Sequence, residues 1–173
     1  KVTIINPNNG EVVRILECEA KDGNIDGLGV TADYLVLGSY YNDIIYVCDK
    51  ETGKLVTSWN TPYYRGGLAC SGNRQSVFMY DWSRRAITEH SLPDGKITGI
   101  VKVDNSVYGL GYSEGAEVLI ASMPWYEIQI LDVENGDVIA KYPIEDVYAI
   151  AGDEGGPDLR WLSSDIKEGV VPA

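Results

Sequence analysis

The sequence predicts an all-β fold made of four similar units, and three observations predict it. Four turns that each contain a glycine recur at a nearly constant spacing along the 173 residues. Segments rich in β-branched and apolar residues flank every turn, as strands require. No stretch shows the 3.6-residue periodicity of an amphipathic helix, so we expect no helix.

The repeated turns share a glycine and a short polar residue four positions before it. The glycines are Gly10, Gly53, Gly95 and Gly136, which are 43, 42 and 41 residues apart. The polar residues are Asn6, Asp49, Ser91 and Asp132. A short polar side chain can accept hydrogen bonds from turn amides, and glycine adopts the positive φ that returns the chain into a strand. We therefore expect hairpins at residues 2–13, 45–56, 87–97 and 128–139.

A second repeating unit lies between the hairpins and contributes two more strands. It pairs a segment of small residues with an apolar segment, at 27–29 and 34–37, 67–69 and 76–79, 109–111 and 117–120, and 149–151 and 159–162. Four strands in about 42 residues are typical of a propeller blade, whose first strand lies at a crowded axis. The sequence therefore predicts a four-bladed β-propeller with four antiparallel strands per blade.

The two ends of the sequence complete one predicted blade. We expect a single propeller over residues 1–173, with blades at 24–60, 64–101 and 106–144 and a fourth blade made of 147–171 plus 1–17. The N-terminal hairpin can pair with strands at about 147–164 of its own chain and close a ring. Alternatively, it completes the last blade of a preceding copy. Either arrangement removes an open sheet edge.

The second hairpin carries a family resemblance. Residues 44–59 read IIYVCDKETGKLVTSW, in which Asp49 precedes the Thr52-Gly53 turn. This stretch resembles a blade of the YVTN-type or quinoprotein-like β-propeller repeat family. The resemblance implies the fold and no particular activity, because members of this family include both enzymes and surface proteins.

The net charge and the lengths of the apolar runs disfavour several classes of binding partner. The chain has 26 acidic and 14 basic residues, for a net charge of −12, so it would repel nucleic acid and anionic membranes. No apolar run reaches the roughly 18–20 residues that cross a bilayer, so we expect no membrane insertion. The first residue is Lys1 and no leader-like segment follows it, so we expect a mature product or one unit of a longer polypeptide.

One segment has the spacing of a calcium-binding loop. Asp22, Asn24 and Asp26 alternate before Gly27, and Asp33 occupies the twelfth position. Oxygen ligands at alternate positions can surround a calcium ion. The same segment also reads as an ordinary loop before a strand, and such a strand would move Asp33 away from the other three residues. Calcium is the only cofactor that the sequence suggests.

The remaining candidates for chemistry are few. His90 is the only histidine and takes the strand position that Ile5, Cys48 and Leu131 take in the other hairpins. No nucleophile and carboxylate are placed around it as a catalytic triad requires, so we expect no enzyme. The three cysteines, Cys18, Cys48 and Cys70, lack metal-ligand spacing. We expect them to be buried small residues, with one disulfide as the alternative.

Aromatic residues gather in two sets of predicted loops that emerge on the same face of a propeller. The candidate interaction residues are Tyr40, Tyr41, Trp82, Trp125 and Tyr126, with Tyr80 beside them. Links between blades add Tyr63, Tyr64, Tyr108 and Tyr148, and nearby carboxylates are Asp43, Asp81, Glu127 and Asp165. These rings can pack between blades, form a protein contact, or stack on a sugar while the carboxylates accept hydroxyl hydrogen bonds.

Three classes of function follow from these observations. We favour a non-catalytic structural or assembly module that binds other copies or neighbouring propeller units. One form of such a module is a unit of a tandem or head-to-tail propeller fibre. The alternative is a propeller that binds a glycan or a small ligand on its aromatic face. A lyase or oxidoreductase rests on family analogy alone. We expect the protein to be extracellular or at the cell surface.

Overall fold

A computed structural model of the chain describes residues 1–21, 24–61, 64–124 and 127–143. These residues form fourteen β-strands and include no helix. They accordingly contain no helical segment with the length and apolar character that a bilayer span needs. The all-β prediction is confirmed.

The strands form three four-stranded antiparallel sheets and one hairpin, each with its strands in chain order. The N-terminal hairpin contains β1 (Val2–Ile5) and β2 (Val12–Leu16). The first sheet contains β3 (Gly27–Val30), β4 (Tyr34–Ser39), β5 (Ile44–Asp49) and β6 (Leu55–Asn60). The second sheet contains β7 (Tyr64–Ser71), β8 (Ser76–Asp81), β9 (Ala86–Ser91) and β10 (Ile97–Lys102). The third sheet contains β11 (Gly109–Ser113), β12 (Val118–Met123), β13 (Glu127–Asp132) and β14 (Val138–Pro143).

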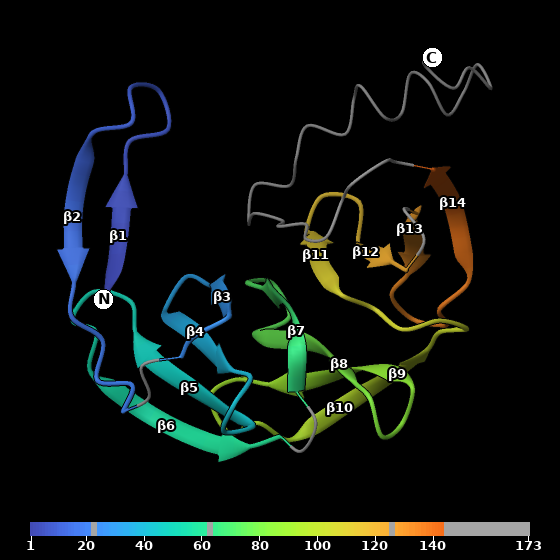
Figure 1. Cartoon of the computed structure of the whole chain (residues 1–173), viewed down its shortest axis with the longest axis horizontal. Coiled ribbons are helices and arrows are strands. Elements are labelled where there is room, and N and C mark those ends of the chain that lie inside the picture. The colour runs from blue at the N-terminus through green and yellow to red at the C-terminus, as the bar shows by residue number, and fades with distance from the viewer. Residues whose placement is uncertain (22–23, 62–63, 125–126, 144–173) are drawn as a thin grey trace.

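The three sheets surround a shared centre, so the fold is propeller-like. Figure 1 shows the first strand of each sheet innermost, and the last strand on the outside. Of the innermost strands, β7 contacts both β3 and β11. The strands predicted for the inner half of a fourth blade, at about 147–164, lie outside the described residues.

The core consists of two layers of side chains between neighbouring sheets. Val77 and Met79 of β8 pack toward the first sheet. Phe78 and Tyr80, which alternate with them, pack toward the third sheet. Successive side chains of a strand point to opposite faces, so a strand covered on both faces must be apolar at every position. This explains why the central strands read as continuous apolar runs.

The four predicted turns are confirmed and share one geometry. In each turn the glycine N–H donates to the carbonyl oxygen of the residue four positions earlier, at 2.8 or 2.9 Å. The glycine φ values lie between 70° and 80°. Three of the polar side chains accept from turn amides as expected: Asn6 Oδ1 from Asn8 at 2.9 Å, Asp49 Oδ1 from Thr52 at 2.7 Å and Asp132 Oδ1 from Glu134 at 2.8 Å. The Ser91 hydroxyl differs, because it donates to Asp94 Oδ1 at 2.6 Å.

The N-terminal hairpin is anchored on the first sheet, on the side away from the second sheet (Figure 1). Leu16 is buried in a cluster with Leu35 and Leu37. The Glu19 amide donates to the Gly53 carbonyl oxygen at 3.0 Å, and Arg14 Nη1 donates to Glu51 Oε2 at 3.3 Å. The hairpin therefore lies where the outer half of the preceding propeller blade would lie.

A buried tyrosine explains two of the small residues near the centre. Tyr64 at the start of β7 is only 1% exposed, and its ring lies against Gly27 and Gly38 of the first sheet. A methyl group added at Gly38 would lie 2.5 Å from Tyr64 Cζ. The first and second sheets can therefore approach closely only while these positions lack a side chain.

We expect Gly38→Ala to lower the free energy of unfolding by about 1–3 kcal/mol, because the added methyl overpacks this interface. Gly115→Ala is the matched control, since its added methyl would meet nothing within 4 Å. The control should change stability by less than about 0.5 kcal/mol. Urea unfolding followed by circular dichroism measures both, and equal stability of the two variants would contradict the packing described for Tyr64.

Candidate functional site

The aromatic loops predicted as an interaction face are partly brought together. Trp82 follows β8 and lies edge-to-face with Tyr80 at 5.4 Å and with Tyr108 at 6.2 Å between ring centroids. Tyr108 comes from the link between β10 and β11 and is 47% exposed, whereas Tyr80 is buried. The three rings thus form a ladder that runs from the core to the surface.

A second aromatic pair lies in the loop between β4 and β5. Tyr40 and Tyr41 contact edge-to-face at 5.2 Å, and Tyr41 is 71% exposed. The Tyr40 amide donates to Asp26 Oδ2 at 3.0 Å, which fixes this loop to the residue that precedes β3. Trp125 and Tyr126 lie outside the described residues, as do Tyr63 and Tyr148.

The structure divides the predicted aromatic residues by role. Tyr64 and Tyr80 are buried between sheets, so packing accounts for them. Tyr41 and Tyr108 present their rings to solvent. Trp82 has an intermediate position, and its buried Nε1 has no hydrogen-bond partner within the described residues.

The carboxylates of these loops are occupied by local contacts. Asp81 Oδ1 accepts from the amides of Ser83 at 2.8 Å and Arg84 at 3.0 Å. Burial alone raises the pKa of Asp81, but hydrogen bonds from the Ser83 hydroxyl and from the amide and guanidinium of Arg84 outweigh it and hold the pKa below its usual value. Glu127 lies 3.7 Å from Lys141, and Asp165 lies outside the described residues. The predicted role of the carboxylates as acceptors for a sugar stays untested.

Two of the four residues of the calcium candidate, Asp26 and Asp33, lie at opposite ends of a strand. Strand β3 runs between Asp26 and Asp33, which places them about 13 Å apart or more along an extended chain. Asn24 is exposed, and Asp22 lies outside the described residues. Within the described ranges, no three His, Cys, Asp or Glu side chains are close enough to hold a metal ion. The positions of Asp26 and Asp33 fit the alternative interpretation, in which this segment is an ordinary loop before a strand.

His90 is buried and both of its ring nitrogens have partners. Nδ1 lies 2.9 Å from the Gly95 carbonyl oxygen, and Nε2 lies 2.9 Å from Thr88 Oγ1. The ring stacks on Trp59 of the first sheet at 6.4 Å between centroids. Because a carbonyl oxygen only accepts, Nδ1 carries the proton. Burial lowers the pKa of His90 in spite of the Gly95 bond and the charge of Asp81, which both raise it.

This lowered pKa makes stability depend on pH. The unfolded chain has a histidine pKa of about 6.5, so below that pH the unfolded state binds a proton that the folded state does not. We expect the free energy of unfolding to fall as the pH drops from 7 toward 5. In His90→Leu, which matches Leu131 of the third sheet, this part of the loss should disappear. Identical pH profiles for both proteins in chemical unfolding would contradict the environment described for His90.

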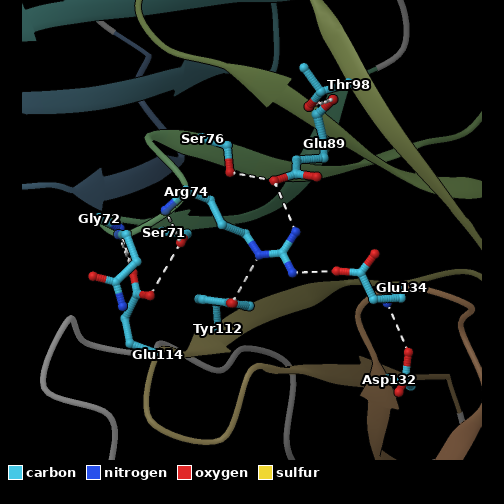
Figure 2. A network of polar contacts seen from close by, with 11 residues as sticks. Ser71, Gly72, Arg74, Ser76, Glu89, Thr98, Tyr112, Glu114, Asp132 and Glu134 are labelled. Atoms are coloured by element: carbon cyan, nitrogen blue, oxygen red, sulfur yellow. Dashed lines mark hydrogen bonds and ion pairs between the residues drawn. The ribbon is translucent and has the colours of Figure 1, made fainter.

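A polar network that sequence reasoning missed joins the second and third sheets. Figure 2 shows the Arg74 guanidinium between Tyr112, Glu89 and Glu134. Nε donates to the Tyr112 hydroxyl at 3.3 Å, Nη1 lies 3.8 Å from Glu89, and Nη2 pairs with Glu134. The hydrogen bond to Glu134 is the main reason that the pKa of Arg74 is raised. The partners lie 15 to 60 positions from Arg74, so no local pattern signals this network.

A carboxylate from the third sheet completes the same network. Glu114 accepts hydrogen bonds from the Ser71 hydroxyl at 3.3 Å, from the Asn73 amide at 3.3 Å and from the Gly72 amide (Figure 2). It thereby satisfies the turn between β7 and β8. We interpret this network as a clamp between sheets, because Arg74 pairs with Glu134 of the third sheet and Glu114 of the third sheet accepts hydrogen bonds from the turn of the second sheet.

Arg74→Met should lower the free energy of unfolding by about 1.5–3 kcal/mol, the range for hydrogen bonds to charged groups, because it leaves Glu89 without its cation. Arg84→Met is the control, since the Arg84 side chain is 50% exposed and, among the described residues, forms an ion pair only with Asp81 at i,i+3 spacing. Exposed pairs contribute less than about 1 kcal/mol. Thermal unfolding compares the two, and an equal effect would show that Arg74 is no clamp.

The three cysteines are free thiols, so the alternative of a disulfide is wrong for this structure. The pKa of Cys48 is raised to about 11, mainly because the thiol is buried and to a smaller extent because Cys18 is nearby. Burial also raises the pKa of Cys18. Neither thiol has the lowered pKa that marks a nucleophilic cysteine.

Comparison with known proteins shows the fold alone. No protein-family model matches the chain, and no curated protein is similar to it in sequence. Solved structures are similar, among them a glutaminyl cyclase from Myxococcus xanthus, with a TM-score of 0.57 and 13% sequence identity. The similarity covers 70% of this chain and 51% of that one, so this chain matches about half the length of the cyclase. These findings support a propeller-like fold, and the YVTN or quinoprotein-like family stays a prediction.

The expectation that the chain is no enzyme is contradicted by this comparison. We drew that expectation from the missing triad around His90, yet a protein with a similar fold is an enzyme. The inference was wrong because a fold carries many chemistries, and catalytic groups need not follow a recognisable spacing. At 13% identity the similarity does not assign catalysis to this chain.

Proposed function

We propose that this chain is an assembly unit, a four-bladed propeller whose fourth blade is shared between neighbouring copies. The N-terminal hairpin supplies the outer half of that blade. The inner half comes from residues 147–171 of the preceding copy, which lie outside the described residues. Copies joined in this way would form a head-to-tail fibre.

The exposure of β1 carries this proposal. Ile5 is 55% exposed, whereas Cys48 and Leu131, at the same position of the first and third sheets, are 0% and 1% exposed. Ile4 is 38% exposed, against 0% for the equivalent Val47. A strand at this place in the repeat is built to be covered, and β1 is not covered by the described residues.

The backbone of β1 supports the same conclusion. Strand β5 pairs with β4 on one edge and β6 on the other, and β9 and β13 are likewise paired on both edges. Within the described residues, β1 pairs only with β2. A free edge of this kind accepts another strand, because the added strand satisfies its N–H and C=O groups.

The anchoring of the hairpin indicates which segment is exchanged. Leu16 is 3% exposed within the cluster of the first sheet, so β2 is already bound to its own chain. The incoming element is therefore the strand pair that covers β1. Full burial of an isoleucine contributes about 1.5–3 kcal/mol, so covering Ile4 and Ile5 is a substantial part of the free energy of association.

Light scattering over a range of concentrations tests the proposal, and we expect the mass to rise with concentration. Ile5→Lys should prevent this rise, because it places a charge on the strand that must be covered. Val13→Lys is the matched control in the same hairpin: Val13 is 67% exposed, and the equivalent Val56 is 48% exposed in the complete first sheet. Assembly that survives Ile5→Lys, or a strict monomer at every concentration, would contradict the proposal.

A second candidate function is ligand binding at the ladder of Tyr80, Trp82 and Tyr108. The half-exposed Tyr108 ring, which contacts Trp82 edge-to-face, is typical of a surface on which a flat or sugar-like molecule stacks. A glycan array with Tyr108→Ala as the comparison tests it. Absence of any signal from the parent chain would reject this function.

A further inference from the structure

Three of the four turn glycines contact the last strand, or the residues at its end, of the sheet or hairpin that precedes them in the chain. Gly53 contacts the backbone of Glu17 and the side chain of Leu16, where the N-terminal hairpin ends. Gly95 lies against the Trp59 ring at the end of β6. Gly136 lies on Lys102 and Val101 at the end of β10. The same contact thus occurs at three successive interfaces.

The contact follows a fixed register. Leu16, Trp59 and Val101 each stand six positions after the turn glycine of their own hairpin, and Glu17 and Lys102 stand seven positions after it. A Cβ atom added at Gly136 would lie 2.7 Å from the Lys102 carbonyl oxygen, and one at Gly53 would collide with the Glu17 carbonyl oxygen. At these turns glycine is needed for the close approach as well as for its positive φ.

Gly10 has the same turn but lacks this contact. Its φ is 73°, equal to that of Gly53, and its amide donates to Asn6 O at 2.8 Å. Yet an added Cβ would meet nothing within 4 Å among the described residues. The turn of the N-terminal hairpin therefore has the shape that fits a neighbouring outer strand, and the described part of its own chain places no strand there.

The third sheet offers the matching strand. Six and seven positions after Gly136 stand Tyr142 and Pro143, at the end of β14. Figure 1 shows β14 and the N-terminal hairpin on opposite sides of the molecule, so this strand does not serve Gly10 of the same chain. Among the described residues, no turn glycine lies on β14.

We propose that the turn Asn6–Gly10 docks on β14 of a second copy, with Gly10 opposite Tyr142 and Pro143. This inference rests on the proposed assembly and specifies its register. Three successive interfaces already join the hairpin to the first sheet, the first sheet to the second and the second sheet to the third. The new interface would be the next in this series. It follows that a side chain at position 10 is tolerated by the single chain and excluded by the assembly.

The first test substitutes asparagine, the residue besides glycine that best tolerates a positive φ. Gly10→Asn should leave the thermal midpoint of the dilute chain unchanged and weaken assembly at least about tenfold, as clashes at packed interfaces do. Gly53→Asn should instead lower the thermal midpoint of the single chain, because its contact is internal. Assembly that is unaffected by Gly10→Asn would overturn the docking site while leaving the proposed function in place.

A crosslinking test covers the case in which Gly10→Asn does not fold. Arg14 and Glu51 are in contact across the first interface, and Ala140 and Asn8 occupy the same register across the proposed one. Two differently tagged copies, one with Asn8→Cys and the other with Ala140→Cys, should be joined by a bismaleimide, with the peptides identified by mass spectrometry. The pair Arg14→Cys and Glu51→Cys within one chain is the control. A crosslink within a single dilute chain that carries both new cysteines would overturn the second-copy assignment, and an absent crosslink in an assembled sample would overturn the register.

Discussion

Each sheet of this protein must be covered on both faces, and the rest of the structure depends on that constraint. Val77 and Phe78 are neighbours in β8, yet one packs against the first sheet and the other against the third. A sheet that is apolar on both faces cannot stand alone in water, because leaving either face bare costs the burial that stabilises it. The sheets therefore continue around a centre, and among the described residues the N-terminal hairpin, with one edge of β1 unpaired, stands at one end of the series.

Local chemistry made much of the fold predictable. Glycine at a fixed spacing, preceded by Asn6, Asp49, Ser91 or Asp132, predicted turns whose hydrogen bonds and φ values proved alike. The position of His90 in a buried strand followed from the same alignment. The interactions between sheets were not predictable: Arg74 reaches Glu134 across 60 positions, and Tyr64 fits into a space left by Gly27 and Gly38 of another sheet. Such contacts depend on how the sheets approach one another, which no local pattern of residues records.

The aromatic residues show the same division. Sequence placed Tyr64, Tyr80 and Trp82 near loops of one face, but it could not distinguish a ring that fills a gap between sheets from one that faces solvent. Burial makes that distinction, with Tyr80 2% and Tyr108 47% exposed. The activity of the protein was harder to infer than the roles of its aromatic residues. A solved structure with a similar fold is an enzyme, and one scaffold carries many functions, so the scaffold does not decide what its loops do.

The central claim is that β1 is covered by another chain. Hydrogen–deuterium exchange of the β1 amides, measured from dilute to concentrated solution, tests it most directly, because an amide on a free strand edge exchanges quickly and a paired one does not. The account predicts that protection of β1 rises with protein concentration, while protection of β5 and β9 stays constant. Full protection of β1 at the highest dilution would contradict it, since the strand would then be covered by its own chain.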